Sequence, residues 1–315
     1  MKKIPIVFDC DTGTDDALAI IAALYCGRFD IRAFTTVAGN VPLLKSSVNT
    51  LNLVRYLGFD IPVARGAAKP LLRRHDDLIR LSIHGEQGMG PLVLPVSDDS
   101  FATENAIEMI KKLAVELGGE LEIIATGPLT NIALFVSVYP ELCPLIKRIV
   151  FMGGAVMGGN LTTSAEFNIF VDPEAARIVL RSGIPLIMVG LDVTQQCRVD
   201  AHMMDATADL KAKAGKIFSL LFSFMGGRTP DEQGRYGSPV LHDPLAVTVA
   251  ALDDMVGLSR YFVDVECEGT YTYGHTFVAK NWRFRGEPNC YVAEAVDSER
   301  FKAWLLDTVA AAEVL

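Results

Sequence analysis

Four aspartates lie within eight residues near the start of the chain, and their type and spacing could hold a cation. The acids are Asp9, Asp11, Asp15 and Asp16. Carboxylates this close together repel one another, and burying any of them without a positive partner is costly. An all-oxygen ligand set favours a hard divalent cation such as Ca²⁺ or Mg²⁺. The alternative is that the acids cap a helix and line a solvated turn, which would occupy only one or two of them.

An apolar run on each side of the acids predicts a strand before them and a helix after them. Residues 4–8 form a short run rich in branched side chains, which is typical of a buried parallel strand. Residues 17–24 are long enough to continue a helix whose first turn contains Asp15 and Asp16, where negative charge suits the helix dipole. Gly13 would make the sharp turn between strand and helix. Ligands bind at such junctions in open α/β sheets.

Cys10 lies inside the acidic motif, and a nucleophilic role for it has to be considered. On a strand its side chain would point away from Asp9 and Asp11 and into packing, so we expect no catalysis by it. The chain has 6 cysteines without CxxC spacing or a Cys/His cluster. They are expected to be free thiols in a reducing compartment, and we predict a cytoplasmic protein.

Composition favours a large folded core and excludes several classes of protein. The chain has 315 residues, of which 50% are hydrophobic and 21% are charged. Its net charge of -9 argues against a nucleic-acid partner, which would call for a basic patch. No apolar run reaches membrane-spanning length, and strand-like sequence begins too early for a signal peptide. No linker or repeat divides the chain, so residues 1–315 are expected to form a single domain.

Predicted strands and helices alternate along the first two thirds of the chain. Strands are expected at 4–8, 31–37, 61–64, 121–125, 148–154 and 184–190, and helices at 44–57, 102–117, 129–138 and 173–182. Residues 201–255 look mostly helical, followed by strand-like segments at 260–267, 276–280 and 290–295 and a last helix at 298–312. The alternation predicts an α/β fold with a mostly parallel central sheet flanked by helices on both faces.

Several predicted strands end in a polar residue or glycine, and these ends share one edge of a parallel sheet. They are Asp11, Asn40, Thr126, Gly153 and Asp192. Polar groups far apart in the sequence can therefore converge there, and we expect the active site at the C-terminal strand ends.

Two loops carry further candidates. His84 opens a Gly-rich loop over residues 84–90, where an isolated histidine is more often a surface residue than a functional one. Asn160, Glu166 and Asn168 follow a predicted strand, and their side chains could hydrogen-bond the vicinal hydroxyls of a sugar. Ordinary loop polarity explains them equally well.

The last candidate is His242-Asp243-Pro244. Asp243 resembles an N-cap followed by proline at the first helical position, as Asp172 before Pro173 does. It could equally be a far-side ligand for the same cation. His242 beside it titrates close enough to neutral pH to donate a proton.

Taken together, these stretches resemble the inosine-uridine-preferring nucleoside hydrolase family over nearly the whole chain. The matching motifs are the acidic signature at 9–16, the run ending at Asn40, His84-Gly85, residues 125–131, 152–154, 166–168 and 172–174, and His242-Asp243-Pro244. Thr12 stands where many members have proline, at a position that shapes the turn. The loop at 84–89 is similar to that of bacterial non-specific ribonucleoside hydrolases.

The resemblance implies Ca²⁺-dependent hydrolysis of the N-glycosidic bond of purine or pyrimidine ribonucleosides to free base and ribose. One Ca²⁺ would be held by Asp11, Asp16, Asp243 and the backbone carbonyl of Thr126. Asp11 would also be the general base that activates a metal-bound water. This ligand set leaves room for water and ribose hydroxyls on an ion that takes six to eight oxygens. The family also implies a homo-oligomer, either a tetramer or a dimer.

The resemblance assigns the substrate contacts as well. Asp15, Asn40 and Asn168 would bind the ribose hydroxyls, Asn160 and Glu166 the 5′-hydroxyl, and His84 would lie near the nucleobase, while His242 would assist the departing base. Cleavage builds positive charge on the ribose ring, which carboxylates around the ring would stabilise.

Two alternatives stay open. Residues 7–14 resemble the strand end of Mg²⁺-dependent phosphohydrolases of the haloacid-dehalogenase type, with Asp9 as the nucleophile. That interpretation leaves Asp15 and Asp16 unexplained and needs a second acidic pair late in the chain. The other alternative is a non-catalytic protein that binds a nucleoside or Ca²⁺. Release of phosphate, or of base and ribose, distinguishes the first from nucleoside hydrolysis, and binding without cleavage would favour the second.

Overall fold

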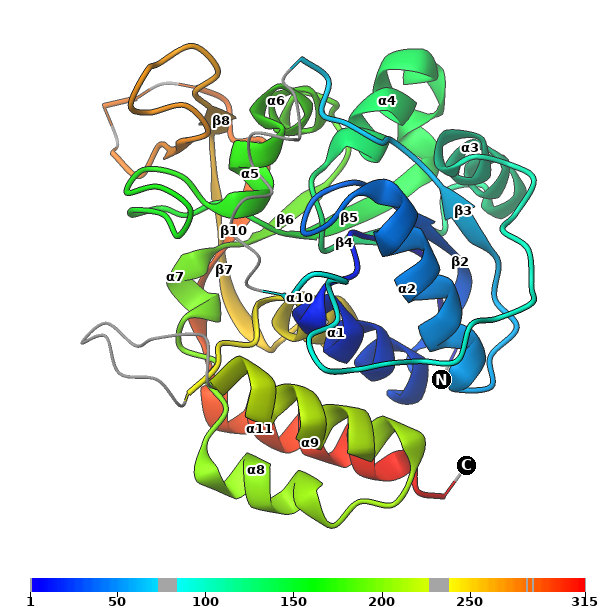
Figure 1. The fold of residues 1–315 in the computed structure, drawn as a ribbon. Helices are drawn as coiled ribbons and strands as arrows, with labels where there is room; N and C mark the ends of the chain where they lie inside the picture. Colours follow the sequence, from blue (N-terminus) through cyan, green and yellow to red (C-terminus); the bar gives the residue numbers. More distant parts are fainter. Residues whose placement is uncertain (1, 73–83, 227–237, 282, 285, 315) are drawn as a thin grey trace.

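The computed structural model describes residues 2–72, 84–226, 238–281, 283–284 and 286–314 and has an eight-stranded sheet at its centre (Figure 1). The strand order is β3-β2-β1-β4-β5-β6-β10-β7. The strands are β1 (Ile4–Cys10), β2 (Phe29–Thr36), β3 (Val63–Arg65), β4 (Leu121–Ala125), β5 (Ile146–Met152), β6 (Leu186–Val189), β7 (Val256–Tyr261) and β10 (Cys290–Val296). Neighbouring strands are parallel except β7, which pairs antiparallel with β10 at one edge. The predicted α/β class with a mostly parallel sheet is confirmed.

Helices cover both faces of this sheet (Figure 1). One face carries α3 (Ala106–Leu117), α4 (Thr130–Val138) and α6 (Pro173–Leu180). The other carries α1 (Thr14–Tyr25), α2 (Leu43–Tyr56) and α10 (His242–Ala251), with α8 (Ala201–Ala208), α9 (Lys213–Gly226) and α11 (Ser298–Ala311) packed outside them. Short helical turns are α5 (Phe167–Val171), α7 (Leu191–Thr194) and the 3₁₀ turn Pro140–Leu145.

The alternation of side chains along β1 explains how it separates two hydrophobic cores. Ile6 and Phe8 pack in the core on the α1 side, while Val7 packs in the core on the α4 side. All three side chains are 0% exposed. Because β1 is central and buried on both faces, its sequence is continuously apolar rather than alternating.

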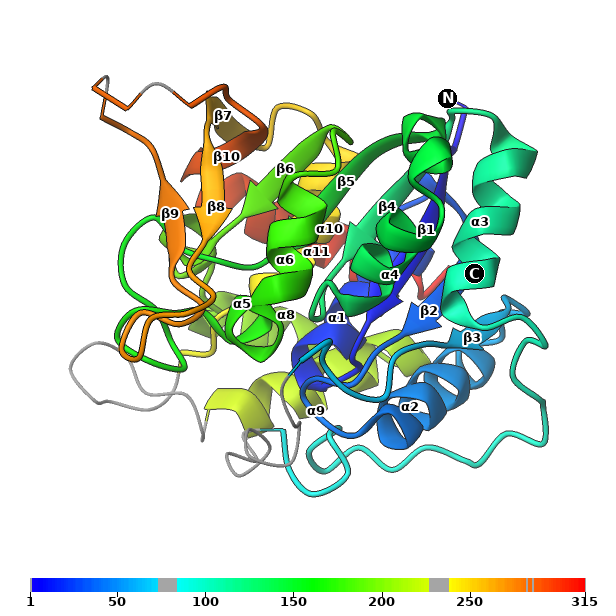
Figure 2. The ribbon, with the colours of Figure 1, turned by 90° about the horizontal axis from the view of Figure 1, so that it is seen from above.

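The chain after residue 255 departs from the predicted elements. The strand expected over 260–267 is two strands, because the chain leaves the main sheet after Tyr261. β8 (Val263–Val265) pairs with β9 (Thr276–Val278) in a small antiparallel sheet, which lies beside α5 and α6 (Figure 2). β10 then inserts between β6 and β7. Of the mostly helical stretch predicted at 201–255, residues 227–237 lie outside the described residues.

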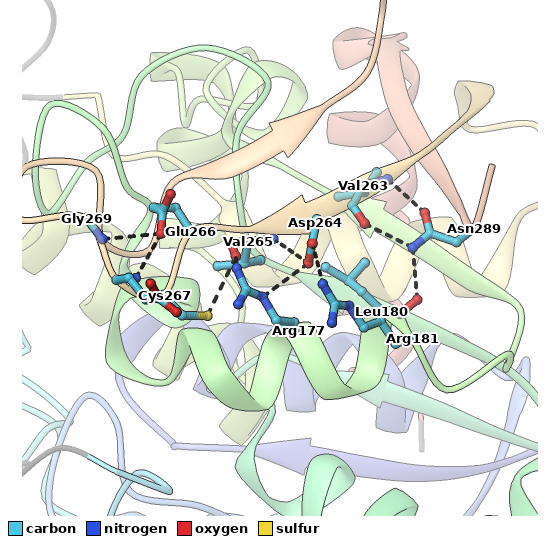
Figure 3. A network of polar contacts seen from close by, with 11 residues as sticks. Arg177, Leu180, Arg181, Val263, Asp264, Val265, Glu266, Cys267, Gly269 and Asn289 are labelled. Atoms are coloured by element: carbon cyan, nitrogen blue, oxygen red, sulfur yellow. Dashed lines mark hydrogen bonds and ion pairs between the residues drawn. The ribbon is translucent and has the colours of Figure 1, made fainter. Parts of the chain in front are cut away.

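Arg177 in α6 and Arg181 directly after it fasten the small sheet to the rest of the molecule (Figure 3). Arg181 pairs with Asp264 at 2.7 Å, and Arg177 both pairs with Asp264 at 3.4 Å and donates to the Val265 carbonyl. Asn289 donates to the Leu180 carbonyl at 2.9 Å and accepts from Val263 N at 2.8 Å. The small sheet is therefore fixed against α6, the helix that follows α5 and residues 166–168.

Within the described part of the chain, every helix is too short or too polar to cross a membrane.

Candidate active site

The C-terminal ends of β1, β2, β4, β5 and β6 bring the predicted polar residues to one edge of the sheet. Asp11 follows β1, Asn40 lies in the turn after β2, and Thr126 follows β4 directly. The backbone N–H of Thr126 donates to the Asp9 carbonyl at 2.9 Å, which joins the ends of β1 and β4. The parallel order of the strands therefore assembles groups that lie more than 100 residues apart in the sequence.

Asp11 and Asp16 lie together in the turn between β1 and α1. Asp11 Oδ2 accepts the Asn40 N–H at 2.5 Å, while Asp11 Oδ1 is buried without a hydrogen-bond partner among the described residues. Asp16 accepts from Gly13 N at 2.9 Å, Thr126 Oγ1 at 2.7 Å and Asn40 Nδ2 at 3.1 Å. Burial, with the nearby Asp16 charge, raises the pKa of Asp11 well above its ordinary value, and burial raises the pKa of Asp16.

Asp15 ties the start of α1 to the start of α10. Its Oδ2 accepts the backbone N–H groups of both His242 and Asp243 at 2.9 Å, and its Oδ1 is buried without a partner in the described chain. Burial raises the pKa of Asp15 to about 8. Burial and the charges of Asp16, Asp15 and Asp11 likewise raise the pKa of Asp243 well above its ordinary value. Asp243, more than 225 residues later in the sequence, therefore lies beside the acidic turn.

The interpretation of Asp243 as an N-cap is wrong. α10 begins at His242 with Leu241 as its cap residue, so the Asp243 carboxylate is in the first helical turn and makes no capping hydrogen bond. Asp172, by contrast, is the predicted N-cap of α6 and accepts from Ala175 N at 3.1 Å.

Asp9, the first acid of the motif, is held by side chains of β2 and α4. Its Oδ1 accepts from Thr35 Oγ1 and, at 2.7 Å, from Asn131 Nδ2. Asn131 also donates to the Thr36 carbonyl at 3.0 Å, so the pair links β1, the end of β2 and α4. Burial raises the pKa of Asp9 to about 7. Asn131 lies in the 125–131 motif, but its sequence position alone gave no sign of this contact.

Asn168 and Glu166 lie where α5 begins, next to the ends of β4 and β5. Asn168 Nδ2 donates to the Thr126 carbonyl at 2.8 Å and to the Met152 carbonyl at 3.1 Å. Glu166 is the N-cap of α5, and its carboxylate accepts three backbone N–H groups, those of Gly154, Asn168 and Ile169. Burial raises the pKa of Glu166 to about 7. Both side chains are therefore fixed by the backbone that surrounds them.

Asn160 stands apart from these groups. It is exposed, and its Oδ1 accepts the Phe167 N–H at 2.9 Å. No hydrogen bond within the described residues joins it to the acidic turn, so its predicted contact with substrate stays a prediction.

His84 reaches the turn from its own loop. Its Nδ1 accepts the Thr14 N–H at 3.2 Å and lies 2.8 Å from Thr14 Oγ1. Burial lowers the pKa of His84 to about 4. The ring is neutral at physiological pH, and because Nδ1 accepts, its single proton is on Nε2. The alternative of an isolated surface histidine does not describe this side chain.

His242 is the first residue of α10. Its Nδ1 is 2.7 Å from Thr194 Oγ1 at the end of α7. Burial, the charge of Arg198 and that of His84 together lower the pKa of His242 to about 4. Thr194 carried no signal in the sequence, because only the fold brings it to this ring.

Cys10 is buried on the opposite side of β1 from Asp9. Its thiol lies 3.4 Å from Thr12 Oγ1 and 3.7 Å from Thr50 Oγ1. Burial raises the pKa of the Cys10 thiol well above its ordinary value. The thiolate is therefore disfavoured, which agrees with the packing role expected for it.

The chemistry of this cluster fits a hard cation. Asp11, Asp15, Asp16 and Asp243 are all buried, and two fully buried oxygens, Asp11 Oδ1 and Asp15 Oδ1, have no hydrogen-bond partner among the described residues. Their mutual repulsion is relieved either by protons or by a positive ion. In the described part of the chain, however, no three His, Cys, Asp or Glu side chains already surround one point as metal ligands do. The donor types fit a cation, while the side-chain arrangement is not a closed coordination sphere.

Comparison with known proteins gives one consistent result. The family model described as "Inosine-uridine preferring nucleoside hydrolase" matches residues 6–303. A pyrimidine-specific ribonucleoside hydrolase of Citrobacter koseri, RihA, is 39% identical over 308 residues, which cover 98% of both chains. Among solved structures, a purine-preferring ribonucleoside hydrolase of Gardnerella vaginalis has a TM-score of 0.92 at 32% identity and covers 99% of this chain and 100% of its own. A plant nucleoside hydrolase, PpNRh1, has a TM-score of 0.92 at 30% identity, covering 98% and 99%.

Proposed function

The chain belongs to the inosine-uridine preferring nucleoside hydrolase family and is a ribonucleoside hydrolase, and on that premise we propose a mechanism that uses Ca²⁺ and Asp11. The observation that carries the proposal is the convergence of Asp11, Asp16 and Asp243 with unpartnered carboxylate oxygen in a buried site. Family membership argues against the haloacid-dehalogenase alternative. It also argues against a non-catalytic binding protein, because the relatives are hydrolases.

The proposed ligands of one Ca²⁺ are Asp11, Asp16, Asp243 and the backbone carbonyl of Thr126. The Thr126 carbonyl accepts one hydrogen bond, from Asn168, and has a second lone pair to offer. All four donors are oxygen, which suits Ca²⁺. When bound, the ion would lower the pKa of a coordinated water and fix the position of that water.

The residues around the ion would divide the remaining work. Asp11, held by the Asn40 N–H, would accept the proton of the attacking water. Asp15, Asn40 and Asn168 would bind ribose hydroxyls and stabilise the positive charge that develops on the ring. Glu166 and Asn160 would bind the 5′-hydroxyl.

His84 and His242 would contact the nucleobase. Both imidazoles are neutral at physiological pH, so His242 would assist the leaving base as a hydrogen-bond donor rather than as an imidazolium.

Pyrimidine ribonucleosides are the proposed substrates. The support is the 39% identity to the pyrimidine-specific enzyme, against 32% to the purine-preferring one. The His84 loop resembles that of non-specific hydrolases, and this resemblance predicts cleavage of both purine and pyrimidine ribonucleosides. That broader specificity stays a prediction.

We also propose that the protein acts in the cytoplasm as a homo-oligomer, as a tetramer or a dimer. All 6 cysteines of the chain are unpaired in the structure, which is consistent with a reducing compartment.

A panel of nucleosides tests the proposed function. Uridine, cytidine, inosine, adenosine and a phosphomonoester would be incubated with the enzyme, with and without a chelator. We expect release of base and ribose from uridine and cytidine, its loss in chelator, and its recovery when Ca²⁺ is added back. Undiminished cleavage in chelator, or release of phosphate alone, would contradict the proposal.

A further inference from the structure

The loop that carries His84 is attached to α2 through its backbone carbonyls. This His84 loop comprises residues 84–90. Lys45 Nζ donates to the Glu86 carbonyl at 2.6 Å, and Asn49 Nδ2 donates to the Gln87 carbonyl at 2.8 Å. Two side chains from neighbouring turns of one helix therefore hold consecutive carbonyls of the loop.

Asn49 does more than hold the loop, because the same amide nitrogen also contacts the acidic turn. Asn49 Nδ2 donates to the Thr12 carbonyl at 3.2 Å. A side-chain amide has two N–H groups, and here one is directed to each carbonyl. A single side chain thus links the turn that bears Asp11 to the loop that bears His84.

The loop fits closely around this link. A Cβ at Gly88, where φ is +87°, would lie 3.2 Å from Asn49 Nδ2 and 2.8 Å from Val41 Cγ1. Met89 is 2% exposed and packs into the core on the α1 side. Within the loop, Gly90 N donates to the His84 carbonyl at 2.8 Å. A shift of the Gln87 carbonyl would therefore be transmitted along a compact turn to His84.

We propose that Asn49 is a positioning residue that fixes the His84 imidazole relative to the acidic turn. The inference rests on the proposed function, because it assumes that His84 contacts the nucleobase. Within the described residues, the hydrogen bonds of the His84 imidazole all go to Thr14. The position of the ring therefore also depends on how its loop is attached to the rest of the protein. Loss of that attachment leaves the carboxylates in place and changes the approach of His84 to substrate.

Asn52 provides a matched control, since it lies one turn further along α2. Its Oδ1 accepts the Ser97 N–H at 2.9 Å and so attaches a different segment to the same helix. Asn49→Ala and Asn52→Ala each remove one helix-to-loop attachment, but only Asn49→Ala removes a side chain that links the His84 loop to the acidic turn.

The kinetic test is a double-mutant cycle with His84→Ala, measured on uridine. We expect Asn49→Ala to lower kcat/KM about tenfold in the wild-type background and to have almost no further effect when His84 is already alanine, because residues that act through one another are not additive. Asn52→Ala is expected to leave kcat/KM within about twofold in both backgrounds. An equal loss for Asn49→Ala with and without His84 would overturn the proposal.

Hydrogen exchange gives a second readout that does not depend on turnover. In Asn49→Ala the amides of Gly88 and Gly90 should exchange at least about tenfold faster than in the wild type, whereas Asn52→Ala should leave them unchanged. Unchanged exchange in Asn49→Ala would overturn the positioning role. If the wild type cleaves no nucleoside, the proposed function fails, and the exchange result still decides whether Asn49 holds the loop.

Discussion

The buried aspartates of the site differ from one another in what surrounds each carboxylate. Asp16 has three hydrogen-bond donors, and Asp15 has two at one oxygen, whereas Asp11 has a single donor and one unpartnered oxygen. A carboxylate with free lone pairs is better placed to accept a proton than one that is fully hydrogen-bonded. This contrast distinguishes Asp11 from Asp16, whereas Asp15 also has one unpartnered oxygen. The general-base role of Asp11 is therefore a proposal that substitution has to test.

The substitution Asp11→Asn tests that assignment. We expect kcat to fall about 10³-fold, because the amide keeps the shape and the bond from Asn40 but cannot take a proton. Measured in chelator, the thermal midpoint should stay the same or rise, since a buried acid without a positive partner is removed. Uridine cleavage and thermal unfolding would be measured together.

Asp192→Asn is the matched control, since Asp192 also follows a strand of the same sheet edge. Its carboxylate holds the backbone of Val156 at 2.7 Å and Met157 at 3.3 Å, and asparagine retains an acceptor there. We expect activity within a few-fold of the wild type. An Asp11→Asn enzyme with near-normal kcat would remove the general-base role.

At the scale of single residues, the sequence identified most of the groups that meet at the site but not the contacts that hold them. The acidic motif, Asn40, His242 and Asp243 were all identifiable from their types and places in the chain. Thr194 beside His242 was not, because it follows a different strand and no local pattern marks it. Such contacts depend on the packing of whole elements.

At the scale of elements, the junction between β1 and α1 requires a residue without a side chain. A Cβ at Gly13 would lie 2.8 Å from Asn40 Nδ2 and 2.9 Å from His84 Nδ1, although its backbone φ of -99° is open to any residue. The predicted turn is present, but glycine is needed there for close approach and not for its conformation.

The substitution Gly13→Ala should therefore lower kcat/KM for uridine at least about tenfold while costing only about 1–2 kcal/mol of stability at a helix N-cap. Gly257→Ala is the control, because its Cβ would meet Ala295 Cβ at an ordinary 3.6 Å. Steady-state kinetics and urea unfolding of both variants would be compared. Wild-type kinetics for Gly13→Ala would show that Asn40 and His84 can move without consequence.

The prediction of elements was most accurate where periodicity and strand-end residues agreed. Strands β1, β2 and β4 were located to within a few residues, since each is a buried apolar run with a polar end. The helix predicted from 102 begins at Ala106, where Asn105 caps it and accepts from Glu108 N. The break after Tyr261 was missed because the apolar residues Tyr261, Phe262 and Val263 run across it without a glycine, proline or polar residue to mark a turn.

At the scale of the whole molecule, one sheet takes strands from both ends of the chain. β10 lies between β6 and β7, and β1 lies at the centre. The position of β10 has no local signal, because pairing between strands a hundred residues apart is decided by tertiary packing. The interpretation of residues 1–315 as a single domain stays a prediction that this shared sheet supports.

The buried acids make the stability of the whole molecule depend on pH and on metal. Burial raises the pKa of Asp15 from 3.8 to about 8 and that of Glu166 from 4.5 to about 7. Between about pH 4 and pH 8 these carboxyl groups hold protons in the folded chain that they have released in the unfolded chain, so their contribution to stability without metal falls as the pH rises. The lowered pKa values of His84 and His242 contribute in the opposite direction, but only below about pH 6.5.

We expect the thermal midpoint in chelator to be lower at pH 8 than at pH 5. Addition of Ca²⁺ at pH 8 should raise the midpoint again, because Ca²⁺ at a hundredfold excess over its Kd adds about 2.7 kcal/mol to the free energy of unfolding. Thermal unfolding at the two pH values, with chelator and with Ca²⁺, would be measured. A midpoint in chelator that rises from pH 5 to pH 8 would contradict the raised pKa values.

The most direct test of the central claim is titration of metal-free protein with Ca²⁺ by calorimetry, with uridine cleavage followed on the same samples. A single ion gripped by Asp11, Asp16 and Asp243 predicts one Ca²⁺ bound per chain, cleavage that rises in proportion to occupancy, and an affinity at least about tenfold weaker in Asp243→Asn. Full cleavage by protein that binds no Ca²⁺ would contradict it.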